Sequence, residues 1–126
     1  MSTAPQWDFL RAPTFHGEKE EYDRWKTQFL AVLNQKDLEE IVAHLRDDED
    51  TPREDDDCKD ESGSVDTAKL KIKQQNKRAF AILITSMAAK TDQERLTFDT
   101  VAATERLDGY PSGYFKKAWL DIKELL

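Results

Sequence analysis

The side chains able to act as nucleophiles or metal ligands are few and scattered along the sequence. The single cysteine, Cys58, and the two histidines, His16 and His44, cannot form a structural zinc site with four ligands. No serine lies in a nucleophile-elbow motif, neither histidine has a motif partner, and the four glycines are too scattered for a phosphate-binding loop. His16 is interpreted as a turn residue and His44 as a surface residue. We therefore predict no catalytic residue, no metal and no cofactor, and expect that the protein is not an enzyme.

Carboxylates are the most abundant groups able to do acid–base chemistry, and they are concentrated in one segment. Residues 46–61 hold ten acids and three bases, which accounts for the whole formal charge of -7; the remaining 16 acids and 16 bases balance. The segment has almost no apolar residue, so burial cannot compensate for the entropy of ordering it. We expect residues 46–64 to form a disordered acidic insert with Cys58 exposed. The functional alternatives are a calcium loop, although the EF-hand spacing and internal glycine are absent, and an acidic activation segment.

Basic side chains follow in the first half of the expected long helix, with no acid among them. They are Lys69, Lys71, Lys73, Lys77 and Arg78. Three interpretations remain open: a solvated helix face, a partner for the acidic insert, or a weak RNA contact.

The first element able to organise these groups is the stretch of residues 13–33, in which an amphipathic helix follows Gly17. Its apolar side chains recur at helical spacing, so they line one face: Tyr22, Trp25, Phe29, Val32 and Leu33. Gly17 lets the backbone turn sharply into this helix, and Phe15 can fold back onto its apolar face. We predict six structural anchors, and expect Trp25 and Trp119 to be buried in one core. The anchors are Phe15, Gly17, Tyr22, Trp25, Phe29 and Trp119.

Four further helices follow from the same periodicity. Asp37 and Glu40 fit a capping box for a short helix ending near Arg46, and a long helix is expected over about 65–90. On its apolar face Asn76 is the one polar residue, and we expect it to bond to backbone. Thr91 and Glu94 begin a fourth helix, and Ser112 is the expected cap of the last.

Length and composition predict one soluble domain. A chain of 126 residues can bury a real core, and no stretch of about 18 apolar residues is present. We divide the chain into an extended arm, residues 1–12, which can dock through Trp7, Phe9 and Leu10, and an all-α domain of about five helices, residues 13–126. No signal peptide is recognised, so an intracellular, cytoplasmic location is expected. The Leu125-Leu126 end suggests a piece of a longer polypeptide.

Two segments together resemble the Gag polyproteins of copia-type LTR retrotransposons. The first is Phe15-x-Gly17 followed by Tyr22-x-x-Trp25-x-x-x-Phe29-x-x-x-Leu33, and the second is the Ala118-Trp119 pair on a helix after Pro111-Ser-Gly113. The resemblance spans roughly residues 13–126. It implies the N-terminal half of a helical capsid domain, which in this family assembles into a particle around the element's RNA.

The partners that follow from this resemblance are further copies of the protein and RNA. We expect homo-oligomers in the longer parent protein and RNA contact mainly through regions outside this chain, with no membrane and no small-molecule substrate. The alternative is a helical protein-interaction module, a Gag-derived adaptor adopted by a host, with the acidic insert as a regulatory loop.

Overall fold

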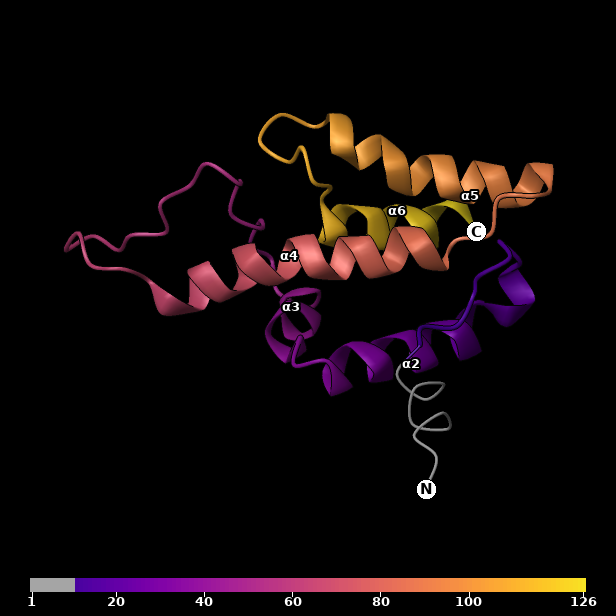
Figure 1. Ribbon diagram of the computed structural model, residues 1–126, viewed down its shortest axis with the longest axis horizontal. Coiled ribbons are helices and arrows are strands. Elements are labelled where there is room, and N and C mark those ends of the chain that lie inside the picture. Colours follow the sequence, from indigo (N-terminus) through magenta and orange to yellow (C-terminus); the bar gives the residue numbers. More distant parts are fainter. Residues whose placement is uncertain (1–10) are drawn as a thin grey trace, which may run out of the picture.

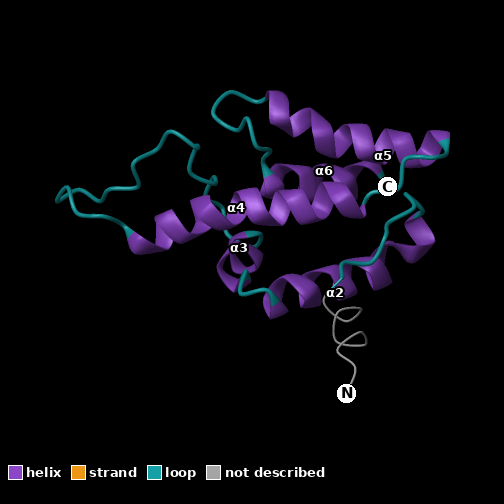
Figure 2. Ribbon diagram, in the orientation of Figure 1, coloured by secondary structure: helices purple, strands orange, loops and turns teal. Residues whose placement is uncertain are grey.

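The computed structural model describes residues 11–126, and the chain is mostly helical, at 59%. The elements are α2 (Lys19–Gln35), α3 (Glu39–His44), α4 (Thr67–Ser86), α5 (Asp92–Ala102), the 3₁₀ turn η1 (Ala103–Arg106) and α6 (Phe115–Leu125). Figure 2 shows the helices and the loops that join them, and no strand in the described part. The predicted all-α class is confirmed. Most of the predicted arm, including Trp7, Phe9 and Leu10, lies outside the described residues.

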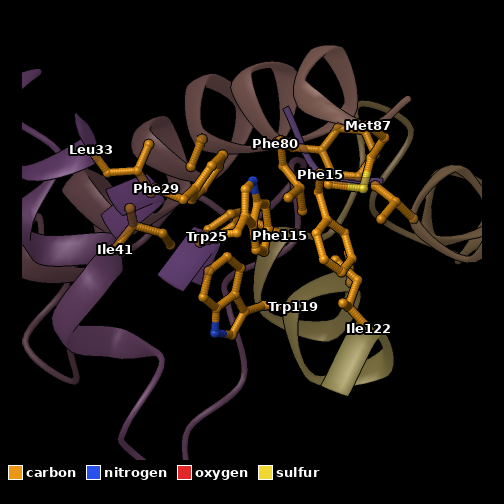
Figure 3. Close-up of a cluster of buried hydrophobic side chains, with 14 of the residues drawn as sticks. Phe15, Trp25, Phe29, Leu33, Ile41, Phe80, Met87, Phe115, Trp119 and Ile122 are labelled. Carbon is orange, nitrogen blue, oxygen red and sulfur yellow. The ribbon is translucent and has the colours of Figure 1, made fainter. Parts of the chain in front are cut away.

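The helices surround one aromatic core. In Figure 1, α5 lies along one edge and α2 along the opposite edge, with α4 and α6 between them. Trp25 is 3% exposed and Trp119 is 7% exposed, so their predicted burial is confirmed. Their rings stack with centroids 5.5 Å apart, and Phe29 lies within 5.5 Å of both (Figure 3). The first and last helices are therefore joined through their aromatic side chains.

The entry to α2 also follows the sequence prediction. Gly17 has φ +78, and a Cβ there would lie 2.9 Å from Thr97 Oγ1, so glycine is required by both conformation and space. Phe15 is buried and stacks on Trp25 with a centroid distance of 4.6 Å. Its backbone N donates to Ser86 O at 2.9 Å, which ties the entry segment to the end of α4.

The predicted cap of the short helix is wrong. Asp37 has φ +62, and α3 begins after Leu38 without a side-chain cap. Leu38 N donates to Leu33 O at 3.0 Å and Asp37 N donates to Asn34 O at 3.3 Å. This is a Schellman motif, in which Asp37 takes the left-handed position after α2 and the leucines make the accompanying apolar contact. Asp37 therefore ends one helix and does not begin the next.

The long helix is shorter than predicted and its first turns lie outside the core. α4 is capped by Asp66, whose Oδ1 accepts from Lys69 N at 3.2 Å. Val65 and Ala68, expected on the apolar face, are exposed. The first buried residue is Gln75, and Ile72 is partly buried, because the start of α4 extends beyond the neighbouring helices (Figure 1).

The fourth helix begins as predicted, whereas the last helix has a different cap. Thr91 and Glu94 form the capping box of α5. Ser112 does not cap α6. The N-cap residue of α6 is Tyr114, and its side chain makes no capping hydrogen bond. Asn76 Oδ1 accepts from Phe115 N at 2.8 Å instead. The predicted backbone partner of Asn76 is thus found, and it is the first residue of α6.

Residues 46–64, predicted as a disordered insert, form a defined loop in the structure, which we term the acidic loop. Within it, Thr51 is 1% exposed and Cys58 is 0% exposed, so the expected exposure of Cys58 is wrong. Glu54 N donates to Gly109 O at 2.9 Å, and Asp66 N donates to Cys58 O at 2.7 Å. The prediction counted apolar residues alone, while this loop is held mainly by hydrogen bonds to other elements.

Thiol labelling of Cys58 measures whether this loop is held in solution. Burial is the main cause that raises the pKa of the Cys58 thiol, and both burial and a low thiolate fraction slow the reaction. We expect an aromatic disulfide reagent to label the folded protein at least about tenfold more slowly than the protein in urea, because a loop-opening free energy of about 1.4 kcal/mol already gives that factor. Equal rates in the two conditions would restore the disordered description.

Candidate functional site

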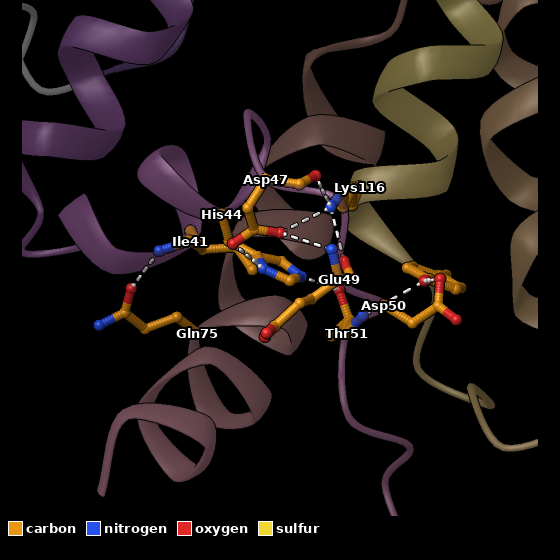
Figure 4. A network of polar contacts seen from close by, with 9 residues as sticks. Ile41, His44, Asp47, Glu49, Asp50, Thr51, Gln75 and Lys116 are labelled. Carbon is orange, nitrogen blue, oxygen red and sulfur yellow. Dashed lines mark hydrogen bonds and ion pairs between the residues drawn. The ribbon is translucent and has the colours of Figure 1, made fainter.

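A polar cluster joins the acidic loop to the helices and contains most of the buried titratable groups. His44, expected on the surface, is 2% exposed. Its Nδ1 lies 3.1 Å from Asp47 Oδ2 and its Nε2 lies 2.9 Å from Thr51 Oγ1 (Figure 4). The burial of His44 could have been predicted from its spacing. It lies three residues after Ile41, which places both on the same face of α3.

Lys116 supplies the cationic centre of this cluster. Its Nζ donates to Asp47 O at 2.7 Å, Asp47 Oδ1 at 3.0 Å and Glu49 O at 2.6 Å. Burial alone would raise the pKa of Asp47, but the hydrogen bonds from Lys116 and His44 outweigh it, and the pKa is lowered. Asp47 is therefore held in its ionised form between two donors.

Two tyrosines complete the attachment of the loop. Tyr110 OH donates to Thr51 O at 2.5 Å, and Thr51 N donates to Tyr114 OH at 3.3 Å. Burial raises the pKa of Tyr110 well above its usual range, with a smaller contribution from Tyr114. Both backbone groups of Thr51 are thereby satisfied inside the protein, which explains how a polar residue can be buried in the loop.

The cluster contains a carboxylate, an imidazole and a hydroxyl bonded in series. In some enzymes the same series consists of an orienting carboxylate, a general base and a hydroxyl nucleophile. Asp47, His44 and Thr51 have the hydrogen bonds of such a relay. Thr51 is 1% exposed, however, and it does not line any of five surface hollows among the described residues. A substrate carbonyl cannot approach the Thr51 hydroxyl without opening the loop. The arrangement supports a structural attachment better than catalysis.

A second pair of titratable groups fastens the entry segment to α5. His16 Nδ1 lies 2.6 Å from Glu94 Oε2, while Glu94 Oε1 accepts from Thr91 N at 2.9 Å and Lys90 N at 3.0 Å. The hydrogen bond from His16, followed by that from Thr91, lowers the pKa of Glu94 to about 2. The same bond to Glu94 raises the pKa of His16. His16 is thus more than the turn residue predicted.

This pair predicts a specific dependence of stability on pH. The pKa of Glu94 is lower in the folded state, so its stabilisation is present above about 4.5 and is lost as pH falls from there toward about 2. The pKa of His16 is raised, so its contribution is present below 6.5 and is lost as pH rises through the raised value. We expect Glu94→Gln to flatten the acid limb of urea unfolding curves. An unchanged acid limb in this variant would contradict the assignment.

The five predicted basic residues, which we term the basic stripe, lie on α4 between residues 69 and 78, and the structure pairs three of them. Lys73 Nζ donates to Asp56 O at 2.6 Å, Lys71 Nζ lies 3.7 Å from Glu40 Oε1, and Arg78 donates to Lys36 O at 3.4 Å. Lys69 and Lys77 have no side-chain hydrogen bond or ion pair within residues 11–126. Lys73 of the basic stripe is thus a partner of the acidic loop, and Lys69 and Lys77 remain available to a ligand.

The described residues show neither a metal-binding cluster nor a membrane-spanning helix. No group of three or more His, Cys, Asp or Glu side chains could hold a metal ion in the described part of the chain. None of its helices is long and apolar enough to cross a membrane. No protein-family model, no curated protein and no solved structure matches this chain. The function proposed below therefore rests on the geometry of the described residues and on the sequence resemblance.

Proposed function

We propose that this chain is a structural, self-associating capsid module, equivalent to the N-terminal capsid region of a copia-type Gag polyprotein, acting in the cytoplasm on the RNA of its element. The observation that supports it most is the meeting of the two resembling segments. Phe15 and Trp25 come from the first, Trp119 comes from the second, and the three rings stack in one core. The residues that carry the resemblance thus define one structural unit.

The burial of the Thr51 hydroxyl fits this role. The one relay of carboxylate, histidine and hydroxyl is closed to solvent at Thr51. The helices instead present charged surfaces of both signs, which suit contacts between proteins and with RNA.

Electron microscopy of the whole product of the reading frame tests the proposal. We expect particles that protect RNA from nuclease. Charge reversal of Lys69 and Lys77 should weaken RNA binding by this chain only modestly, and the remaining affinity should fall steeply with salt. Lys19→Glu with Lys90→Glu is the matched control, because both are exposed lysines away from the stripe. A whole protein that stays monomeric and free of RNA would overturn the proposal.

The second candidate is a helical protein-interaction module, such as a host-adopted Gag-derived adaptor. The feature that favours it is the defined acidic loop, because a surface held in place is suited to recognising a partner. A stoichiometric host protein captured by the chain, and lost on neutralising exposed loop acids such as Asp55 and Asp57, would favour this function over particle assembly.

A further inference from the structure

A groove of about 280 Å³ lies between α2, α3 and α6. Its floor is apolar, its rim carries three cations, and no acidic residue among the described ones lines it. The lining residues are Tyr22, Lys26, Leu30, Val42, Leu45, Arg46, Trp119, Leu120 and Lys123.

The groove leaves apolar surface uncovered. Leu120 is 46% exposed, and Leu30, Val42 and Leu45 are half-buried. Lys26 Nζ lies 5.5 Å from the centre of the Tyr22 ring, and the nearby carboxylate of Asp23 lies 3.9 Å from this nitrogen. Lys123 has no side-chain hydrogen bond or ion pair in the described part. A partner for this groove needs an apolar side chain surrounded by carboxylates.

Such a surface occurs on the same chain, in residues 54–66, which we term the acidic arm. The arm carries seven acids and one base. Next to them Val65, with 56% of its surface exposed, is the most exposed of the large apolar side chains described. In Figure 1 the arm extends beyond the helices at the N-terminal end of α4, away from α6 and the C-terminus.

The arm is held in this position by its own contacts. Lys73 Nζ donates to Asp56 O at 2.6 Å, and an isolated bridge joins Lys59 to Val65. Asp57 and Glu61 are exposed and, within residues 11–126, have no side-chain partner. Because the arm is already ordered, little entropy is lost when it binds, and its unpaired carboxylates can meet cations of another molecule.

We propose that the acidic arm of one copy docks in the basic-rimmed groove of a second copy, with Val65 against the apolar floor and Asp57 and Glu61 near Lys26 and Lys123. The inference rests on the proposed self-association and gives it an interface. Arm and groove are different surfaces, so the contact is heterologous: each copy keeps one free arm and one free groove, and association propagates to a ring or an open chain. A small, charge-steered contact of this kind is expected to be weak and sensitive to salt.

Complementary charge reversal tests the contact in the chain of 126 residues. The groove variant carries Lys26→Glu and Lys123→Glu, and the arm variant carries Asp57→Lys and Glu61→Lys. In sedimentation velocity on nuclease-treated protein at low salt, we expect the wild type to exceed the monomer mass of 14.6 kDa increasingly with concentration. Each variant alone should stay monomeric. An equimolar mixture should associate again, because each variant's groove then matches the other's arm.

Matched variants separate the contact from a general effect of charge or hydrophobicity. Lys19→Glu with Lys90→Glu changes the net charge as the groove variant does but lies outside the groove, and it should associate like the wild type. Val65→Ser should weaken association at least about tenfold, since it removes the apolar side chain that is buried against the floor of the groove. Leu96→Ser, on α5 outside both the arm and the groove and 49% exposed, should not.

The outcomes distinguish this inference from the function on which it rests. A mixture of the two variants that stays monomeric while the wild type associates overturns the contact. If the whole protein forms particles and both variants form them equally well, the contact is again wrong, although the capsid proposal stands. Association of the wild type that persists at high salt does not depend on these charges and also overturns the inference. The same holds for association that requires RNA.

Discussion

Replacing Trp25 with alanine is expected to lower the free energy of unfolding by about 3–5 kcal/mol. Trp25 is 3% exposed and its ring contacts Phe15, Phe29 and Trp119, with the farthest of these centroids 5.5 Å away. Its Nε1 also donates to Pro13 O at 2.9 Å. The substitution therefore leaves a cavity where α2, α6 and the entry segment meet. Domains of this size are typically stable by only roughly 5–15 kcal/mol, so the effect is large.

Urea unfolding followed by circular dichroism measures this loss. Trp25→Phe is the matched variant, because it keeps an aromatic ring in the cluster and removes the hydrogen bond to Pro13; it should cost clearly less than alanine. Leu96→Ala, at an exposed position of α5, should change stability by less than about 0.5 kcal/mol. A Trp25→Ala variant as stable as the wild type would show that the aromatic cluster does not hold the first helix.

The aromatic core could be predicted because its information is local and periodic. Tyr22, Trp25 and Phe29 lie on one face at helical spacing, and burial of that face follows whatever the partner helix is. The same logic located α6 through Trp119 and Ile122. The conformation of the entry glycine could also be predicted, because a sharp turn into a helix is a local feature of the backbone; its close approach to Thr97 could not.

The attachment of the acidic loop could not be predicted from local pattern. Thr51 is bonded by Tyr110 and Tyr114, which lie 59 and 63 residues away in the sequence. Lys116 reaches the carbonyl groups of Asp47 and Glu49 across a similar separation. Composition describes what a segment can bury by itself, whereas these bonds depend on where the fold brings α6. The candidate site was missed for the same reason: the position of His44 on the buried face of α3 could be predicted, but its partner Thr51 is held by the distant Tyr110 and Tyr114.

The caps of helices also depend on residues that are distant in sequence. Ser112 has the residue type of a helix cap, but it lies two residues before the N-cap position Tyr114, and its backbone N donates to Glu54 Oε1 at 2.8 Å. The start of α6 is satisfied from elsewhere: Tyr114 N donates to Thr104 Oγ1 at 3.2 Å and Phe115 N donates to Asn76 Oδ1 at 2.8 Å. A cap supplied by a distant helix leaves no signature in the sequence around the helix that it caps.

The remote cap leads to the second large effect, which is expected for Asn76→Ala. Asn76 is 2% exposed, and its Nδ2 also donates to Gly113 O at 2.9 Å. Alanine leaves the buried Gly113 carbonyl and Phe115 amide without their partner, at about 1–3 kcal/mol for each group. We therefore expect a loss of about 2–5 kcal/mol in urea unfolding. Gly113 cannot shift freely to find another donor, because it has φ +96 and packs directly against the Phe80 ring.

Gln74→Ala is the control for this change, because Gln74 is an exposed amide two residues earlier on α4. It should leave stability within about 0.5 kcal/mol of the wild type. Hydrogen exchange distinguishes a lost cap from a general loss of packing. In Asn76→Ala the amide of Phe115 and the first turn of α6 should exchange faster than the middle of α4, since the cap acts on the start of α6. Uniform loss of protection across α4 and α6, or none at all, would mean that Asn76 does not hold the end of one helix against the side of another.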